Sequence, residues 1–121
     1  MFSILLTDDD EGVRTALRLN LEAAGYQVKE ARGGREALEL YRQAPTDVVV
    51  TDILMPDTDG LEATLVLARE YPDAKIIAMT GASGKTNFLD VAKLFGAQKV
   101  LQKPFPMEEL LQAIREVLKP A

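Results

Sequence analysis

The chain has 121 residues, a length that suits one domain built around a single hydrophobic core. Hydrophobic residues make up 47% and charged residues 27%, which is typical of a globular domain rather than a disordered or membrane-embedded chain. The net charge of −5 argues against direct nucleic-acid binding. Because the chain contains neither cysteine nor histidine, disulfides, thiolate or imidazole metal ligands and histidine-based catalytic triads are excluded.

The sequence predicts a cytoplasmic domain without a membrane anchor. The apolar run at residues 2–6 is too short for a signal peptide or a membrane span, and a block of acids follows it. We expect one domain over residues 1–121, within which residues 119–121 could begin a linker.

Five short apolar runs alternate with amphipathic segments along the chain. The expected strands comprise residues 4–6, 26–31, 48–50, 75–79 and 99–101. The expected helices lie between residues 10 and 25, from about 34 to 43, and over residues 60–71, 86–95 and 107–118. Strands that alternate with helices predict an α/β fold with right-handed crossovers and a parallel sheet. The expected architecture is a doubly wound, five-stranded (βα)5 fold of the flavodoxin-like type, with strand order 2-1-3-4-5 and helices on both faces.

Polar residues follow the apolar strands at positions where this topology would bring them together. Asp8 and Asp9 follow the first strand and Asp52 follows the third, and these strands would be neighbours. The fourth strand leads to Thr80, and Lys103 follows the fifth. Three adjacent carboxylates repel one another unless a cation intervenes. With no histidine or cysteine available, a hard, oxygen-seeking ion such as Mg²⁺ is the best match.

This constellation resembles the receiver domain of two-component response regulators. The resemblance extends from Ile4 to about Leu118 and is carried by four motifs in the expected order. These are the Asp8-Asp9 pair, Asp52 in Asp-Ile-Leu-Met-Pro-Asp-Thr-Asp-Gly, Thr80 after an apolar strand, and Lys103-Pro104-Phe105. It implies a signalling switch rather than an enzyme, in which Asp52 accepts a phosphoryl group from the phosphohistidine of a sensor histidine kinase or phosphotransfer protein.

The resemblance also implies how the cofactor is held. Mg²⁺ (or Mn²⁺) would be bound directly by Asp9 and Asp52, partly through water by Asp8, and by the backbone carbonyl of Leu54. Lys103 and Thr80 would contact phosphoryl oxygens.

The family relation further implies a structural and a switching role for residues around the site. The Lys103–Pro104 peptide bond would be cis, as it is in the family. Phosphorylation would shift the populations of the Thr80–Thr86 loop, which includes Gly81, and of the fourth helix toward an active state. That state would control an unidentified output partner or effector domain.

The chain departs from the family pattern at several positions. Val100 stands where many receivers have tyrosine or phenylalanine, so output is expected to depend more on the 80–86 loop and the fourth helix. Gln98-Lys99 replaces acids that transcription-factor receivers use for dimerisation, so a monomer or a weak homodimer is expected. Apolar Leu54 and Ala82 predict slow autodephosphorylation.

Other motifs suggest alternatives. Aligning Asp57–Gly60 with a calcium loop would put Met55 and Val66 at ligand positions, so we expect Gly60 to turn the chain and cap the third helix. The 80–86 segment lacks one glycine of a P-loop, because Met79 stands there.

A haloacid-dehalogenase-type phosphatase remains the enzyme alternative. Its Asp-x-Asp motif would be Asp8-Asp9-Asp10, although Gly12 and the lack of an aspartate after Lys103 depart from that pattern. In that family Asp8, not Asp52, would be the nucleophile.

Overall fold

The computed structural model describes residues 1–53, 59–81 and 96–119. Its elements follow the predicted alternation and differ from the predicted bounds by no more than about two residues. They are β1 (Ser3–Thr7), α1 (Glu11–Ala23), β2 (Gln27–Ala31), α2 (Gly34–Gln43), β3 (Val48–Asp52), α3 (Asp59–Glu70), β4 (Ile76–Thr80), β5 (Lys99–Gln102) and α5 (Met107–Leu118). The expected fourth helix, residues 86–95, lies outside the described residues.

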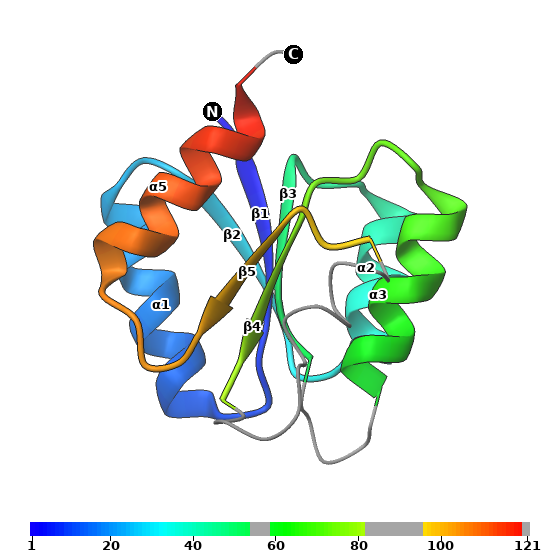
Figure 1. Cartoon of the computed structure of the whole chain (residues 1–121), viewed down its shortest axis with the longest axis horizontal. Coiled ribbons are helices and arrows are strands. Elements are labelled where there is room, and N and C mark those ends of the chain that lie inside the picture. The colour runs from blue at the N-terminus through cyan, green and yellow to red at the C-terminus, as the bar shows by residue number, and fades with distance from the viewer. Residues whose placement is uncertain (54–58, 82–95, 120–121) are drawn as a thin grey trace.

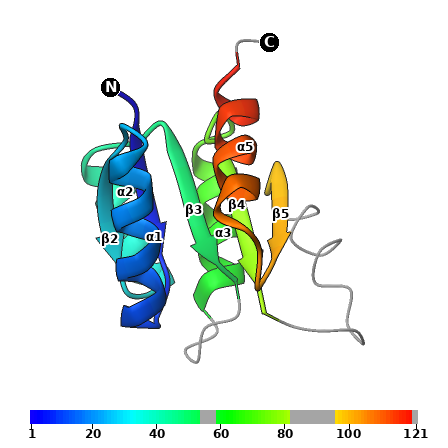
Figure 2. The ribbon, with the colours of Figure 1, turned by 90° about the vertical axis from the view of Figure 1, so that its left-hand side faces the viewer.

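The five strands form one parallel sheet in the order β2-β1-β3-β4-β5, as predicted. Figure 1 shows α1 and α5 covering one face and α2 and α3 covering the other. In Figure 2, after a quarter turn, α1 and α5 lie in front of the sheet, and the strands run toward the same end. The fold is therefore doubly wound, and β1 and β3 lie side by side at its centre.

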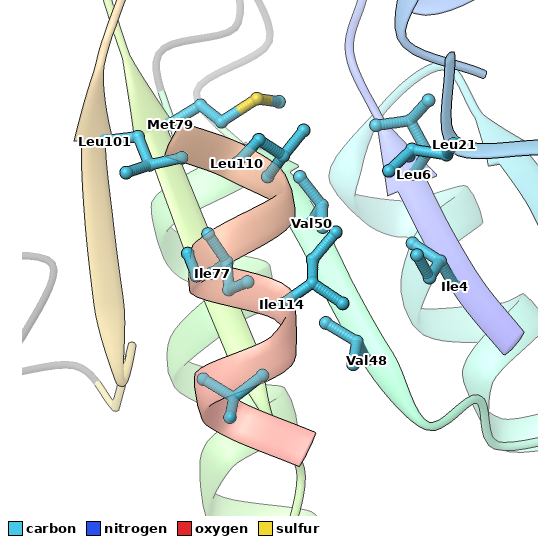
Figure 3. Close-up of a cluster of buried hydrophobic side chains, with 12 residues drawn as sticks. Ile4, Leu6, Leu21, Val48, Val50, Ile77, Met79, Leu101, Leu110 and Ile114 are labelled. Atoms are coloured by element: carbon cyan, nitrogen blue, oxygen red, sulfur yellow. The ribbon is translucent and has the colours of Figure 1, made fainter. Parts of the chain in front are cut away.

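The larger hydrophobic core lies between the sheet and the α1/α5 layer. Figure 3 shows Leu110 and Ile114 of α5 reaching toward the aliphatic side chains of the central strands. We call this set the α5-side cluster; its buried members are Ile4, Leu6, Leu21, Val48, Val50, Ile77, Met79, Leu101, Leu110, Ala113, Ile114 and Val117. The opposite face buries a second cluster that includes Leu5, Val49, Ile76 and Tyr41. Because successive side chains of a strand point to opposite faces of the sheet, the same strands contribute residues to both cores.

Helix α1 begins and ends where the sequence provides capping residues. The Asp10 side chain accepts a hydrogen bond from the Val13 amide at 3.0 Å and caps the helix at its N-terminus. Gly25 follows the helix with φ of 99°, a left-handed conformation that glycine adopts without a steric penalty. On the helix itself Arg14 and Leu21 are buried, whereas Val13 is only half-buried.

The sequence singled out two further glycines, Gly60 and Gly81. Helix α3 begins at Asp59, so Gly60 lies inside its first turn rather than before it. Gly81 follows β4 and does not have a positive φ; within residues 1–53, 59–81 and 96–119, only Gly25 and Gly96 do. Gly81 therefore lies at the strand end without the left-handed geometry that glycine alone tolerates well.

Candidate functional site: an acid cluster at the carboxyl edge of the sheet

The site is the continuation of the α5-side cluster along the same strands. Side chains two residues apart on a strand point to the same face. On that face Asp8 follows Leu6 in β1, and Asp52 follows Val50 in β3. The chain therefore changes from aliphatic to ionised side chains in one step along two neighbouring strands, at the carboxyl edge of the sheet.

Asp8, Asp9 and Asp52 form one cluster, as the sequence predicts. A carboxylate oxygen from each lies within 4.8 Å of the others. Asp8 and Asp52 are buried, whereas Asp9 is exposed. Three carboxylates in this arrangement are consistent with a magnesium site, because Mg²⁺ takes oxygen ligands and the chain has no histidine or cysteine to favour a softer metal.

Lys103 joins the cluster from the segment after β5. Its Nζ donates to Asp8 Oδ2 at 2.6 Å and to Asp52 Oδ2 at 2.9 Å. Burial alone would lower the pKa of the Lys103 ammonium, but its hydrogen bonds to the two carboxylates, with their charges, raise that pKa above the usual lysine value. One ammonium against three carboxylates leaves the cluster short of positive charge, which favours a cation.

Main-chain hydrogen bonds fix the strand ends that carry these groups. The Lys103 amide donates to the Thr80 carbonyl at 2.7 Å, and the Ile53 amide donates to the Met79 carbonyl at 3.0 Å. The Lys103–Pro104 peptide bond is cis, as the resemblance implies. The two main-chain hydrogen bonds connect β4 on both sides to the segments that carry Asp52 and Lys103.

The Asp8 carboxylate uses both of its oxygens. Its Oδ1 accepts from the Asp10 amide at 2.9 Å, and its Oδ2 accepts from Lys103. Its main-chain carbonyl accepts from Arg14 Nη1 at 2.8 Å. Asp8 is therefore held on several sides, and the role of Arg14 was not predicted from the sequence. The available signal was its spacing: Arg14 lies three residues before Leu17 and seven before Leu21, on the stripe that faces the sheet.

The remaining predicted site residues are placed less directly. Thr80 is buried as the last residue of β4. Val100 in β5 packs against the second hydrophobic cluster, on the face opposite the α5-side cluster. Leu54, Ala82, the 82–86 part of the switch loop and the fourth helix lie outside the described residues, so the structure does not test their expected roles.

A doubly wound sheet with an acid cluster and a lysine at its carboxyl edge defines a class of α/β domain equipped to bind a hard cation beside a carboxylate. Comparison with known proteins gives the family. The chain belongs to the response regulator receiver domain family, whose model matches residues 4–115. Phosphorylation-activated switching is typical of this family, which acts in two-component signalling with histidine kinases and is not a family of conventional enzymes.

Individual relatives agree with this assignment. Response regulator MprA of Mycolicibacterium vanbaalenii is 41% identical over 119 residues, which are 96% of this chain and 50% of the relative. The chain thus spans about half the length of the curated relatives it matches.

Solved structures share the whole fold. Chemotaxis protein CheY4 of Vibrio cholerae aligns with a TM-score of 0.89 and 32% identity, covering 98% of this chain and 99% of that one. Response regulator TrrA of Thermotoga maritima, solved in complex with Mg²⁺-BeF, aligns with a TM-score of 0.87 and 32% identity and covers 98% and 100% of the two chains. No helix among the described residues has the length and apolar character needed to cross a membrane.

Proposed function

We propose that this chain is one receiver domain in which Asp52 accepts a phosphoryl group. The observation that carries the proposal is the position of Asp52: its carboxylate is buried at the end of β3, 2.9 Å from the Lys103 ammonium and beside two further carboxylates. A buried carboxylate paired with a lysine at the carboxyl edge of a parallel sheet is well placed to act as a nucleophile toward phosphorus.

The transfer exchanges one bond to phosphorus for another. An Asp52 carboxylate oxygen attacks the phosphorus of a phosphohistidine on the partner kinase or phosphotransfer protein. A P–O bond forms, the P–N bond breaks, and the imidazole leaves with the electron pair. The product is an aspartyl phosphate. Lys103 would move its hydrogen bond from the carboxylate to a phosphoryl oxygen, acting as a compact positive charge, which is how lysine commonly serves phosphate.

The donor set fits Mg²⁺, with Mn²⁺ as the alternative. Asp9 and Asp52 would bind the ion directly, Asp8 would bind partly through water, and the Leu54 carbonyl would complete the protein ligands. Asp8 suits an indirect role because both of its carboxylate oxygens already accept hydrogen bonds. Asp9 is exposed, and within residues 1–53, 59–81 and 96–119 its carboxylate accepts no hydrogen bond. When bound, the ion supplies positive charge that offsets the negative charge of the transferring phosphoryl group.

Buried Thr80 and the neighbouring Gly81 connect the site to its output. The Thr80 hydroxyl would donate to the phosphoryl group and shift the 80–86 loop, which controls an output partner or effector domain. Val100 carries no aromatic ring to couple with this movement, so the loop and the fourth helix would carry the signal. We expect a monomer or a weak homodimer located in the cytoplasm, without direct nucleic-acid or membrane binding by this domain.

The experiment is phosphorylation by acetyl phosphate with Mg²⁺, followed by mass spectrometry and mapping of the modified peptide. We expect one phosphoryl group on Asp52, lost in Asp52→Ala and dependent on the metal. Retention of the modification in Asp52→Ala, or its location on Asp8, would contradict the proposal and favour the haloacid-dehalogenase alternative. The decay of the phosphoprotein after removal of acetyl phosphate then tests the expectation of slow autodephosphorylation.

A further inference from the structure

Arg14 is a buried cation that the proposed chemistry does not use. Its side chain is only 8% exposed, although it lies in the first turns of helix α1. A buried guanidinium is costly unless its donors are paired. Arg14 meets this requirement in two directions: Nη1 donates to the Asp8 main-chain carbonyl at 2.8 Å, and Nε donates to Glu30 Oε1 at 3.0 Å.

The carbonyl that Arg14 holds belongs to the peptide unit between Asp8 and Asp9. A peptide unit is planar, so the direction of that carbonyl also fixes the direction in which the chain leaves toward Asp9. Asp8 is restrained independently by Lys103 and the Asp10 amide. For exposed Asp9, no hydrogen bond or ion pair restrains the side chain among the described residues. The Arg14 bond is therefore well placed to keep the Asp9 carboxylate within the cluster.

Glu30 at the end of β2 holds the guanidinium in turn. Its Oε1 accepts from Arg14, and its Oε2 lies 3.1 Å from Arg18 Nε. Arg18 also pairs with Glu22 on the helix surface at 2.8 Å. Glu30 is thus shared between buried Arg14 and the more exposed Arg18, and of these two arginines only Arg14 reaches the Asp8–Asp9 peptide. The planar guanidinium of Arg14, bonded to Glu30 on one side and to the Asp8 carbonyl on the other, has little freedom to rotate.

We propose that Arg14 is a positioning residue, oriented by Glu30, that fixes the Asp8–Asp9 peptide and thereby aims the Asp9 carboxylate at the cation. This inference rests on the proposed function, because it assigns Arg14 a task only if the acid cluster binds a divalent ion. It differs from two simpler roles. If Arg14 only joined α1 to β2, its loss would lower stability without changing metal affinity. If it acted only by charge, its loss would tighten binding of a cation.

The experiment measures the Mg²⁺ dissociation constant of the whole chain by isothermal titration calorimetry, with the metal ion alone as ligand. Substitution of residues that orient metal ligands commonly lowers affinity by 10- to 100-fold, so we expect Arg14→Gln to weaken Mg²⁺ binding about tenfold. Arg14→Lys keeps the charge but cannot span both partners, and it should weaken binding as well. Glu30→Gln keeps an acceptor for Arg14 and should have a smaller effect than Arg14→Gln.

Arg18→Gln is the matched control. It removes an arginine of the same helix and a partner of the same Glu30, but among the described residues Arg18 forms no hydrogen bond or ion pair with Asp8 or Asp9. We expect its Mg²⁺ affinity to stay within about twofold of that of the unmodified chain. Metal-free thermal unfolding, followed by circular dichroism, shows that each variant is folded. If Arg14→Gln fails to fold, Arg14→Lys and Glu30→Gln carry the test.

The inference is overturned if the folded Arg14 variants bind Mg²⁺ as tightly as the unmodified chain or more tightly, or lose no more affinity than Arg18→Gln. Failure of the proposed function looks different, because the unmodified chain would then bind no Mg²⁺ and acquire no phosphoryl group on Asp52. If the Arg14 variants bind Mg²⁺ as tightly as the unmodified chain, and the unmodified chain binds Mg²⁺ and is phosphorylated on Asp52, only the positioning role of Arg14 is contradicted.

Discussion

Two successive layers on one face of the sheet are built from the same strands but differ in what stabilises them. In the inner layer, Leu6, Val50 and Leu101 pack under the α1/α5 layer with exposures of 0 to 6%. Two residues further along, the outer layer contains Asp8 and Asp52, and Lys103 follows β5. The inner layer gains free energy from burial of apolar area. The outer layer contains buried charge that only hydrogen bonds and opposite charge make tolerable.

The difference explains why the site lies where it does. The aliphatic layer fixes the strand ends, so the carboxylates are held close together despite their repulsion. Lys103 offsets part of that repulsion and leaves a net deficit of positive charge for a cation to fill. Stability and cation binding should therefore be separable by substitutions in the two layers.

The largest effect on stability is expected for Ile114→Ala in the inner layer. Ile114 is fully buried under the central strands, and truncation of a buried isoleucine costs about 2–5 kcal/mol through lost burial and the cavity left behind. Urea unfolding should show a lower midpoint with an unchanged slope. Leu111→Ala, on the same helix but only partly buried, should cost less. A change of more than about twofold in the Mg²⁺ affinity of folded Ile114→Ala would show that the two layers are coupled.

Asp9→Asn should have the converse effect in the outer layer. The exposed side chain contributes little to metal-free stability, so the change should stay within about 0.5 kcal/mol. A dication and a carboxylate about 4 Å apart in water attract by about 2 kcal/mol, so loss of the charge should weaken Mg²⁺ binding about thirtyfold. Asp10→Asn is the control, because asparagine caps a helix about as well as aspartate. Equal Mg²⁺ affinities for the two variants would rule out Asp9 as a ligand.

Lys103→Met should move metal binding and phosphorylation in opposite directions. Removal of the ammonium leaves three uncompensated carboxylates, which should tighten Mg²⁺ binding about tenfold at low salt. Phosphorylation by acetyl phosphate should slow, because the phosphoryl group loses its cationic partner. Lys99→Met removes a lysine of β5 that pairs with Glu116 instead, and it should change neither quantity. Weaker Mg²⁺ binding in Lys103→Met would contradict the electrostatic account.

Much of this arrangement could be predicted from the sequence, because it follows from the spacing of apolar residues and from the order of strands and helices along the chain. The β-branched run at 48–50 indicates a buried strand, and the alternation of strands with helices predicts a parallel sheet. The strand order was taken from the known doubly wound arrangement for five strands, and the structure shows that order. The convergence of Asp8, Asp9 and Asp52 followed from that order. Helix α5 matched its predicted bounds, Met107–Leu118, because its apolar residues recur at helical spacing.

What could not be predicted depends on side-chain contacts between distant segments. The sequence placed Lys103 at the site, but its simultaneous contact with Asp8 and Asp52 depends on how β5 docks against β4. Arg14 could not be predicted as a buried residue, because a charged residue next to an apolar stripe is expected to point to solvent. The separation of buried Asp8 from exposed Asp9 was readable in principle, since Asp8 alone continues the inward alternation of Ile4 and Leu6.

The smallest expected effect is the dependence of stability on alkaline pH. The Lys103 pKa is raised by its carboxylate partners in the folded state, so the ammonium stabilises the fold fully below about 10.4, the ordinary lysine pKa. Above that pH, Lys103 loses its proton in the unfolded chain but keeps it in the folded chain. The free energy of unfolding therefore falls with rising pH until the pH exceeds the pKa of Lys103 in the folded chain. The stability difference between the unmodified chain and Lys103→Met, measured by urea unfolding between about pH 8 and 11.5, should therefore be constant up to about pH 10 and narrow above it. Burial also raises the pKa of Tyr41. Because Tyr41 is present in both proteins, its contribution cancels from the difference in stability. A difference that narrowed between pH 8 and 9 would mean that Lys103 is not held as an ammonium by Asp8 and Asp52.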